Sequence, residues 1–354
     1  MNKPLQIGDL TAPIPVIQGG MGVGISLSGL AGAVAKAGGI GIISTAQIGF
    51  RKEEYSTDPL AANLEAIGEE IGKAKAVAEG GIVGVNIMVA TTDYELYVKA
   101  AVEAGADLVV SGAGLPMNLP ELTAGSRTKI APIVSSKKAA SVIIRQWQRK
   151  YHRLPDLVVI EGPYAGGHLG FDKDYLEKLI SREIPEDDFD REVQDIISYV
   201  REVEAEHQAK IPVVVGGGIF DRQDMEHYMA MGAHGVQVAT RFVATYECDA
   251  DERYKQAYVD ATAEDIVLVK SPVGMPGRAI RNEFMKRVEA GERLMGPCRH
   301  CVKTCKPATT PYCISQALIN AALGKVEEGL IFCGGHVDRV KEIVSVEDVM
   351  RSFA

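Results

Sequence analysis

The chain has 354 residues, which is enough for one large α/β domain with an appendage or for two domains. Its hydrophobic content of 46% and charged content of 24% are ordinary for a globular protein in water. The net charge of −9 and the lack of basic runs with interleaved aromatic residues argue against a nucleic-acid partner. The chain shows neither a signal-peptide pattern nor an apolar stretch of about 18 residues, so we expect a cytoplasmic protein without a membrane partner.

Short apolar segments alternate with helical patterns up to residue 242. The expected strands are 14–18, 39–43, 82–88, 107–111, 131–135, 156–161, 212–216 and 235–240. The expected helices are 28–37, 61–78, 93–104, 138–150, 191–206 and 222–231. Nearly continuous apolar strands separated by helices are typical of a parallel sheet covered on both faces. Eight such units predict an α/β fold, a closed (β/α)8 TIM barrel over residues 1–242, rather than a six-stranded open sheet.

Polar and glycine-rich segments follow six of the expected strands. These segments are 19–22, Asn86, 111–114, 135–137, His168 and 216–218. Because the strands of a parallel barrel all end on one face, the segments should meet there. The sequence therefore predicts a single active site at this face, whereas an open sheet would distribute the segments over two sides.

Two consecutive loops have the composition of a phosphate site. The run G-G-G-I-F-D begins at Gly216, and G-A-H-G-V-Q-V-A-T-R-F extends from Gly232 to Phe242. Loops after strands 7 and 8 of a barrel commonly bind a phosphate through backbone N–H groups. The implied ligand is a phosphorylated cofactor whose ring reaches the barrel mouth, which for this arrangement means FMN.

One histidine follows a strand in a glycine-rich context. The run E-G-P-Y-A-G-G-H-L-G covers residues 161–170 and contains His168. Glycines allow a backbone to approach a flat ligand closely, and a histidine beyond a strand end can act as acid, base or hydrogen-bond donor near neutral pH. We therefore interpret His168 as the candidate catalytic group, with a purely structural histidine as the alternative.

These motifs resemble the nitronate monooxygenase family, formerly called 2-nitropropane dioxygenases, and are similar to those of FMN-dependent enoyl-acyl-carrier-protein reductases. The matching segments are 15–22, 84–88, 112–116, 161–170, 216–219 and 237–242. The resemblance implies an FMN-binding barrel in which His168 is catalytic. The family usually has Gly-Thr before Arg-Phe, whereas this chain has Ala239-Thr240.

The resemblance also implies a set of residues around FMN. Gln18, Gly19, Gly20 and Met21 would lie beside the ring, and Asn86 would hydrogen-bond the flavin or its ribityl chain. Ser135 or Lys137 would approach the polar edge of the flavin. The other expected contacts are Glu161, Gly166, Gly167, Gly216, Gly217, Gly218, Gln237, Ala239 and Thr240.

The pattern changes after residue 242, and residues 243–354 are predicted to form a mainly helical cap over the barrel mouth. Helical patterns cover 247–264, 282–292 and 315–322, and a loop rich in Pro and Gly is expected at 271–278. The apolar content of this region is too high for a disordered tail.

The predicted cap contains four clustered cysteines, Cys298, Cys301, Cys305 and Cys313. In a chain without export signals, such spacing favours a metal or redox role over disulfides. Four thiolates could bind zinc or a [4Fe–4S] cluster. Four reduced, unligated cysteines are the alternative.

The sequence leaves three functions open for a protein that we expect to bind a small molecule, with a homodimer among the possible assemblies. The first is FMN-dependent oxidation of alkyl nitronates to carbonyl compounds and nitrite. The second is FMN-dependent reduction of an enoyl thioester, quinone or related activated alkene by NAD(P)H.

No Rossmann G-x-G-x-x-G follows a strand, so NAD(P)H would bind transiently at the flavin in the second function. An oxygen-sensitive iron–sulfur cluster would favour the second function. The third is a non-catalytic flavin- or metal-binding regulator.

Overall fold

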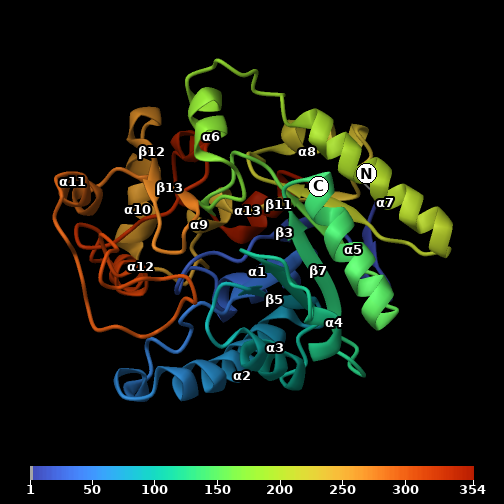
Figure 1. The fold of residues 1–354 in the computed structure, drawn as a ribbon, viewed down its shortest axis with the longest axis horizontal. Helices are drawn as coiled ribbons and strands as arrows, with labels where there is room; N and C mark the ends of the chain where they lie inside the picture. Colours follow the sequence, from blue (N-terminus) through green and yellow to red (C-terminus); the bar gives the residue numbers. More distant parts are fainter. Residues whose placement is uncertain (1–2) are drawn as a thin grey trace.

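The computed structural model describes residues 3–354 and confirms the predicted barrel (Figure 1). Eight parallel strands close in the order β10, β11, β3, β4, β5, β6, β7, β8. In chain order they are β3 (Val16–Gln18), β4 (Ile40–Ser44), β5 (Ile82–Met88), β6 (Leu108–Gly112), β7 (Lys129–Val134), β8 (Val158–Glu161), β10 (Val213–Gly216) and β11 (Gly235–Val238). Each lies within about two residues of an expected strand, because continuous β-branched runs are suited to a sheet that is buried on both faces.

The inside of the barrel is a packed hydrophobic core. Inward side chains such as Ile17, Ile40, Leu108 and Val214 form one cluster. A short hairpin before the barrel, β1 (Leu5–Ile7) and β2 (Leu10–Ala12), contributes three buried residues to the same cluster. The hairpin therefore closes the N-terminal end of the barrel and leaves only the other end for a ligand.

Helices cover the outside of the barrel. They are α1 (Ser28–Lys36), α2 (Pro59–Ala78), α3 (Tyr94–Glu103), α4 (Leu119–Leu122), α5 (Lys137–Tyr151), α6 (Lys173–Ile180), α7 (Asp190–His207) and α8 (Arg222–Ala230). Side-chain caps fix several starts: Asp58 accepts the Ala61 N–H at 3.0 Å, and Asp221 begins α8 with a capping box. None of the described helices is long and apolar enough to cross a membrane.

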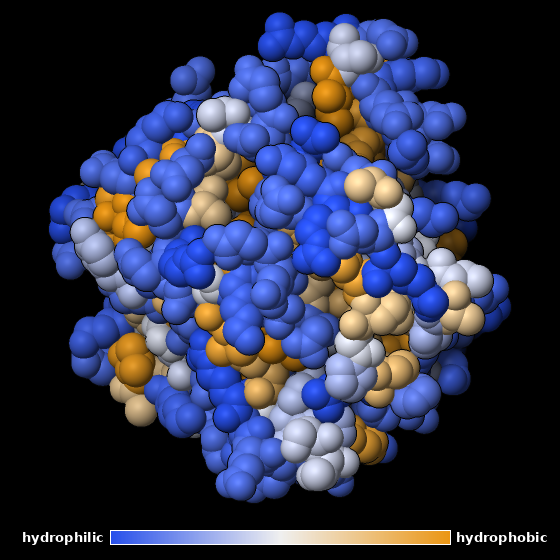
Figure 2. Space-filling view, turned by 90° about the vertical axis from the view of Figure 1, so that its left-hand side faces the viewer, coloured by the Kyte–Doolittle hydropathy of each residue, from blue (hydrophilic) through white to orange (hydrophobic). Residues whose placement is uncertain are grey.

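The helices predicted after residue 242 are present, separated by long loops and a small sheet. They are α10 (Glu252–Asp260), α11 (Glu283–Glu289) and α12 (Ile314–Ala322); the structure adds α13 (Val346–Arg351), and the short α9 (Thr240–Val243) spans the boundary. In Figure 2, which faces this side of the molecule, apolar residues appear as separate spots among hydrophilic ones. This appearance indicates that most apolar side chains of the region point inward.

The predicted loop at 271–278 is wrong in its last three residues. Pro276–Ile280 form β13, which pairs antiparallel with β12 (Ile266–Lys270) on one side and with β9 (Gly167–His168) on the other. The pairing buries Arg278 and Ala279 and gives the backbone of this Pro- and Gly-containing segment hydrogen-bond partners. The consequence is that His168 belongs to a small sheet shared between the barrel and the region after it.

The last helix, α13, returns to the barrel wall. Its buried residues Val346, Val349 and Met350, with Phe353 just beyond, pack with residues of α1, β3 and β11. This is the position next to the first barrel helix, where the eighth helix of such a barrel is expected. The division of the chain at residue 242 is therefore a division of sequence pattern, and we retain it only as a proposal.

Candidate active site

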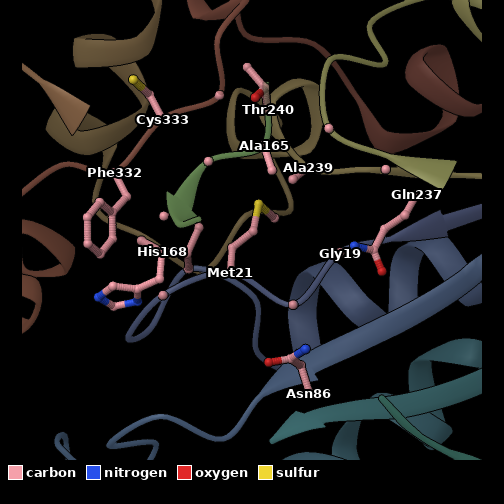
Figure 3. A pocket seen from close by; sticks show the side chains of 18 of the residues that line it. Gly19, Met21, Asn86, Ala165, His168, Gln237, Ala239, Thr240, Phe332 and Cys333 are labelled. Atoms are coloured by element: carbon pink, nitrogen blue, oxygen red, sulfur yellow. The ribbon is translucent and has the colours of Figure 1, made fainter. Parts of the chain in front are cut away.

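A cavity opens at the C-terminal ends of the barrel strands, as predicted for the active site (Figure 3). Figure 3 shows Met21, Asn86 and His168 facing the same space from three different elements. Fourteen of the predicted site residues line the cavity: Gly19, Gly20, Met21, Asn86, Glu161, Gly166, Gly167, His168, Gly216, Gly217, Gly218, Gln237, Ala239 and Thr240.

Three predicted cofactor residues lie outside the lining. Gln18 is fully buried and joins β3 to β4, because its side chain both donates to the Ile42 carbonyl and accepts the Ile42 N–H at 3.1 Å. Ser135, which does not line the cavity, donates a hydrogen bond to Glu161 Oε2 at 3.2 Å. Lys137 is exposed at the start of α5, where its N–H donates to Glu192 at 2.5 Å. These residues were expected at the flavin from the family resemblance, which does not specify which side chain faces the cavity.

Glycines allow the walls of the cavity to come close together. A Cβ at Gly20 would overlap the Cβ of Asn86, and a Cβ at Gly217 would lie 2.6 Å from the Gly162 carbonyl oxygen. Gly217 and Gly218 also have φ of +96° and +98°, which other residues rarely adopt. The two glycines therefore form a cradle in which backbone groups are not shielded by side chains.

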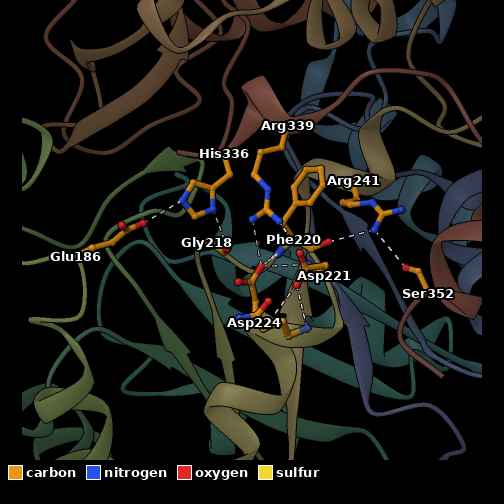
Figure 4. A network of polar contacts seen from close by, with 10 residues as sticks. Glu186, Gly218, Phe220, Asp221, Asp224, Arg241, His336, Arg339 and Ser352 are labelled. Atoms are coloured by element: carbon orange, nitrogen blue, oxygen red, sulfur yellow. Dashed lines mark hydrogen bonds and ion pairs between the residues drawn. The ribbon is translucent and has the colours of Figure 1, made fainter.

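A polar network supports the glycine cradle from the C-terminal region (Figure 4). His336 stacks on Tyr164 at 5.2 Å and contacts the Gly218 carbonyl through Nδ1 at 3.0 Å. Next to it, the guanidinium groups of Arg241 and Arg339 both lie over the Phe220 ring. These contacts hold the loop after β10 in place although its glycines favour flexibility.

His168 contacts two residues of the C-terminal region. Its Nε2 lies 2.6 Å from Ser271 Oγ, and its ring meets Phe332 edge-on at 5.0 Å. The Ser271 oxygen also accepts the Val273 N–H at 3.2 Å, which fixes the serine. Burial lowers the pKa of His168 to about 4, so the imidazole is neutral and can accept a proton at neutral pH.

Glu161 lies at the end of β8 on the same cavity. Burial raises its pKa to about 7, although hydrogen bonds from the Gly170 N–H at 3.0 Å and from Ser135 oppose the shift. A carboxyl group that titrates near neutral pH and a neutral histidine on one cavity are typical of acid–base sites.

Arg278 carries an unpaired donor beside the cavity. Its side chain is 1% exposed, and Nη1 donates to the Ala165 carbonyl at 2.6 Å, but Nη2 has no partner among the described residues. Burial lowers the pKa of Arg278 from its ordinary value, because no carboxylate compensates the charge. Ala165 itself lines the cavity and its N–H lies next to Gly217. The arrangement suits an anionic ligand at this end.

Several lining or supporting residues were not predicted from the sequence. They are Tyr164, Arg278, Ser271, Phe332, Cys333 and His336. One signal was available: Cys333-Gly-Gly-His336 repeats the Gly-Gly-His pattern of residues 166–168. Tyr164 lies in the glycine-rich run 161–170 that the sequence singled out, although its own role was not predicted. Only the fold connects Ser271, Arg278 and Phe332 with the site.

The predicted metal centre is not shown as a set of side chains around a single ion. Within residues 3–354, no three His, Cys, Asp or Glu side chains are placed to hold a metal ion. Cys298, Cys301, Cys305 and Cys313 are free thiols, and they line a second cavity that is separate from the first.

Fold and site define a (β/α)8 barrel with a glycine-walled ligand cavity and a neutral histidine at its C-terminal face. The model of the nitronate monooxygenase family matches residues 3–354, and the chain belongs to this family. It is therefore an oxidoreductase.

Relatives with curated names are distant. A probable nitronate monooxygenase of Staphylococcus saprophyticus is 26% identical over 298 residues, covering 79% of each chain. A (3aS,4S,5R,7aS)-5-hydroxy-7a-methyl-1-oxo-octahydro-1H-indene-4-carboxyl-CoA dehydrogenase of Mycobacterium tuberculosis is 27% identical over 286 residues, covering 80% of this chain and 67% of the relative.

Solved structures share the fold. FabK from Thermotoga maritima is 24% identical with a TM-score of 0.70, covering 96% of this chain and 91% of its own. A nitroalkane oxidase from Streptomyces ansochromogenes is 19% identical with a TM-score of 0.70, covering 96% of this chain and 94% of its own.

Proposed function

We propose that the protein is an FMN-dependent oxidoreductase of the nitronate monooxygenase type, which oxidises alkyl nitronates to carbonyl compounds and nitrite. The observation that carries the proposal is the neutral His168, which faces the same cavity as the glycine cradle. The family match and the staphylococcal relative point to the same chemistry.

The residues of the cavity fit FMN. Gly217 and Gly218 offer a cradle that a Cβ would fill, and the orphaned Nη2 of Arg278 offers a buried positive charge for the phosphate. Gly19, Gly20, Met21 and Asn86 form the wall where a flat ring would lie. When bound, FMN would accept electrons from the substrate and pass them to dioxygen.

The chain's own side chains would bind the substrate and move a proton. The neutral Nε2–Ser271 pair of His168 can accept a proton from the carbon next to a nitro group, or hydrogen-bond the oxygen of an existing nitronate. Phe332 packs against His168 and limits water on that side. Met21 contributes an apolar surface to the same cavity.

A second function is reduction of an enoyl thioester or related activated alkene by NAD(P)H. The mycobacterial relative named as a CoA-ester dehydrogenase favours it, as does the structural likeness to the enoyl reductase domain of MlnA from Bacillus amyloliquefaciens, 12% identical with a TM-score of 0.68.

Anaerobic flavin reduction separates the two functions. The purified protein should be yellow and release FMN on denaturation. An alkyl nitronate alone should bleach the flavin without oxygen, and in air nitrite should accumulate. Bleaching by NADH or NADPH and not by nitronate would assign the protein to the second function, and release of FAD or of no flavin would refute both.

A further inference from the structure

Four cysteines from one loop region surround a single cavity. Cys298, Cys301, Cys305 and Cys313 all line a cavity of about 350 Å³, and none of its lining residues belongs to the flavin cavity. A single water molecule occupies about 30 Å³, so the space exceeds what one ion or one water would fill. A cavity of this size that is lined by four thiols can hold a group larger than a single ion.

The backbone of the loop is bent so that the thiols converge. His300 adopts a left-handed conformation with φ of +51°, which turns the chain between Cys298 and Cys301. A turn closed by the Cys305 N–H to the Val302 carbonyl at 3.3 Å brings in the third thiol. Cys313 then stands at the N-terminus of α12, and its N–H donates to the Leu294 carbonyl at 3.0 Å.

The surroundings are basic and partly apolar, which suits an anionic thiolate-ligated group. Arg299, His300 and Lys303 line the cavity, and its described lining contains no Asp or Glu. Cys301 and Cys305 pack against the hydrophobic cluster around Tyr312. Ser315 donates to the Cys301 sulfur at 2.9 Å, a contact of the kind that tunes iron–sulfur centres.

The cysteine loop is attached to the barrel directly beside the flavin cavity. The Thr92 N–H donates to the Cys301 carbonyl at 3.1 Å, and the Lys303 N–H donates to the Ala90 carbonyl at 2.9 Å. This segment follows β5, whose Asn86 and Met88 line the flavin cavity, as does Thr91. A group held by the cysteines would therefore lie one loop away from the flavin.

We propose that Cys298, Cys301, Cys305 and Cys313 bind a [4Fe–4S] cluster, with one thiolate on each iron. The proposal does not depend on nitronate oxidation, and an oxygen-sensitive cluster would favour the second function, reduction by NAD(P)H. A zinc ion requires all four sulfurs about 2.3 Å from one point, and no three of the described ligand-type side chains meet that way. In a cubane cluster each thiolate binds a different iron, so the four sulfurs enclose a larger volume, which suits thiols that line one cavity of about 350 Å³.

Metal and sulfide analysis of the full-length protein tests the proposal. After anaerobic purification or reconstitution with iron and sulfide, we expect about four irons and four acid-labile sulfides per chain. The dithionite-reduced protein should give an electron paramagnetic resonance signal of a reduced cluster, and air should bleach the absorbance that FMN does not account for.

Single substitutions locate the ligands. Cys298→Ser, at the most exposed of the four positions, should lower bound iron several-fold while FMN content, which reports folding, is retained. Cys248→Ser is the matched control, because Cys248 is buried elsewhere, with its thiol donating to the Ile25 carbonyl at 3.4 Å, and should keep full iron. About one zinc per chain, no metal after reconstitution, or equal iron in both variants would overturn the proposal, and none of these readouts depends on turnover.

Discussion

His168 and Glu161 line the same cavity, and burial shifts their pKa values in opposite directions. For both groups burial disfavours the charged form, so the pKa of the histidine falls to about 4 and that of the carboxyl rises to about 7. At neutral pH the site therefore holds a neutral base beside a partly protonated acid. The charged groups at the cavity would therefore be the FMN phosphate and Arg278, rather than His168 or Glu161.

The substitution His168→Ala should separate catalysis from cofactor binding. We expect FMN to be retained, because the glycine cradle is untouched, and turnover to fall about 10²–10⁴-fold, the range for general acid–base catalysis. Steady-state kinetics with the substrate found by flavin bleaching measures the loss. Ser271→Ala, which removes the Nε2 contact but leaves the imidazole, should give a smaller loss. Nearly full activity in His168→Ala would return this residue to a structural role.

The raised pKa of Glu161 predicts that the stability of the protein depends on pH. Its folded pKa of about 7 exceeds the ordinary value of 4.5, so the folded state binds a proton that the unfolded state releases between these values. Its contribution to the free energy of unfolding is therefore complete below about pH 4.5 and is lost as pH rises to 7. Thermal unfolding should show the wild type losing stability between about pH 4.5 and pH 7 relative to Glu161→Gln. Parallel pH curves for the two proteins would contradict the shift.

Arg278 predicts opposite effects on stability and cofactor affinity. Replacing a buried guanidinium whose Nη2 has no partner among the described residues by an apolar side chain of similar length should raise the melting temperature of FMN-free Arg278→Met. The same change should weaken FMN about 10–100-fold, the value of one charge-assisted hydrogen bond. Riboflavin, which lacks the phosphate, is the control ligand and should bind both proteins alike. Equal weakening of both flavins would place Arg278 away from the phosphate.

At the scale of elements, the sequence predicts the barrel well because its signals are local. Each strand is a continuous apolar run, and each run is followed by glycine or polar residues that the closed barrel brings to one face. The glycine cradle, Asn86 and His168 were found in this way. Gln18 and Lys137, which were expected at the flavin from the resemblance, do not line the cavity, because a motif does not specify which way a side chain points.

The part of the site that could not be predicted is formed by pairing between distant segments. Gly167 and His168 join β13 more than a hundred residues later, which brings Ser271 to the imidazole and Arg278 to Ala165. The β9 segment has only two residues, too short for any periodic pattern. Its partner β13 contains Pro and Gly, which in a sequence indicate a loop.

The loop after β10 predicts a sharp contrast between two glycine substitutions. Gly217→Ala should lose FMN binding and stability, since φ is +96° and the new Cβ would meet the Gly162 carbonyl. Gly72→Ala is the matched control: it lies within α2 with open space around it, and it should stabilise the protein by about 0.5–1 kcal/mol. Flavin titration and thermal unfolding report both effects. Normal FMN affinity in Gly217→Ala would show that the cradle is not a binding element.

At the scale of the whole molecule, the barrel and the region after residue 242 share hydrophobic cores. One cluster joins Val23 and Phe50 of the barrel with Tyr254 and Ile331. Another joins the wall of β3 and β11 with α13. Such shared burial couples the two regions energetically, so the change in sequence pattern at residue 242 does not imply independent folding.

The last helix therefore predicts a single cooperative unit. Phe353 is fully buried against the barrel wall, and Phe353→Ala should cost about 3–5 kcal/mol, a large part of a typical stability of about 5–15 kcal/mol. Because the lost contacts support the strand before the cavity, FMN release and loss of helical signal should shift to lower temperature together. Arg351→Ala is the control: its ion pairs with Glu347 and Asp348 are exposed, so it should change stability by at most about 1 kcal/mol. Two separate thermal transitions in Phe353→Ala, with flavin release unchanged, would show that residues 1–242 hold the cofactor as a domain of their own.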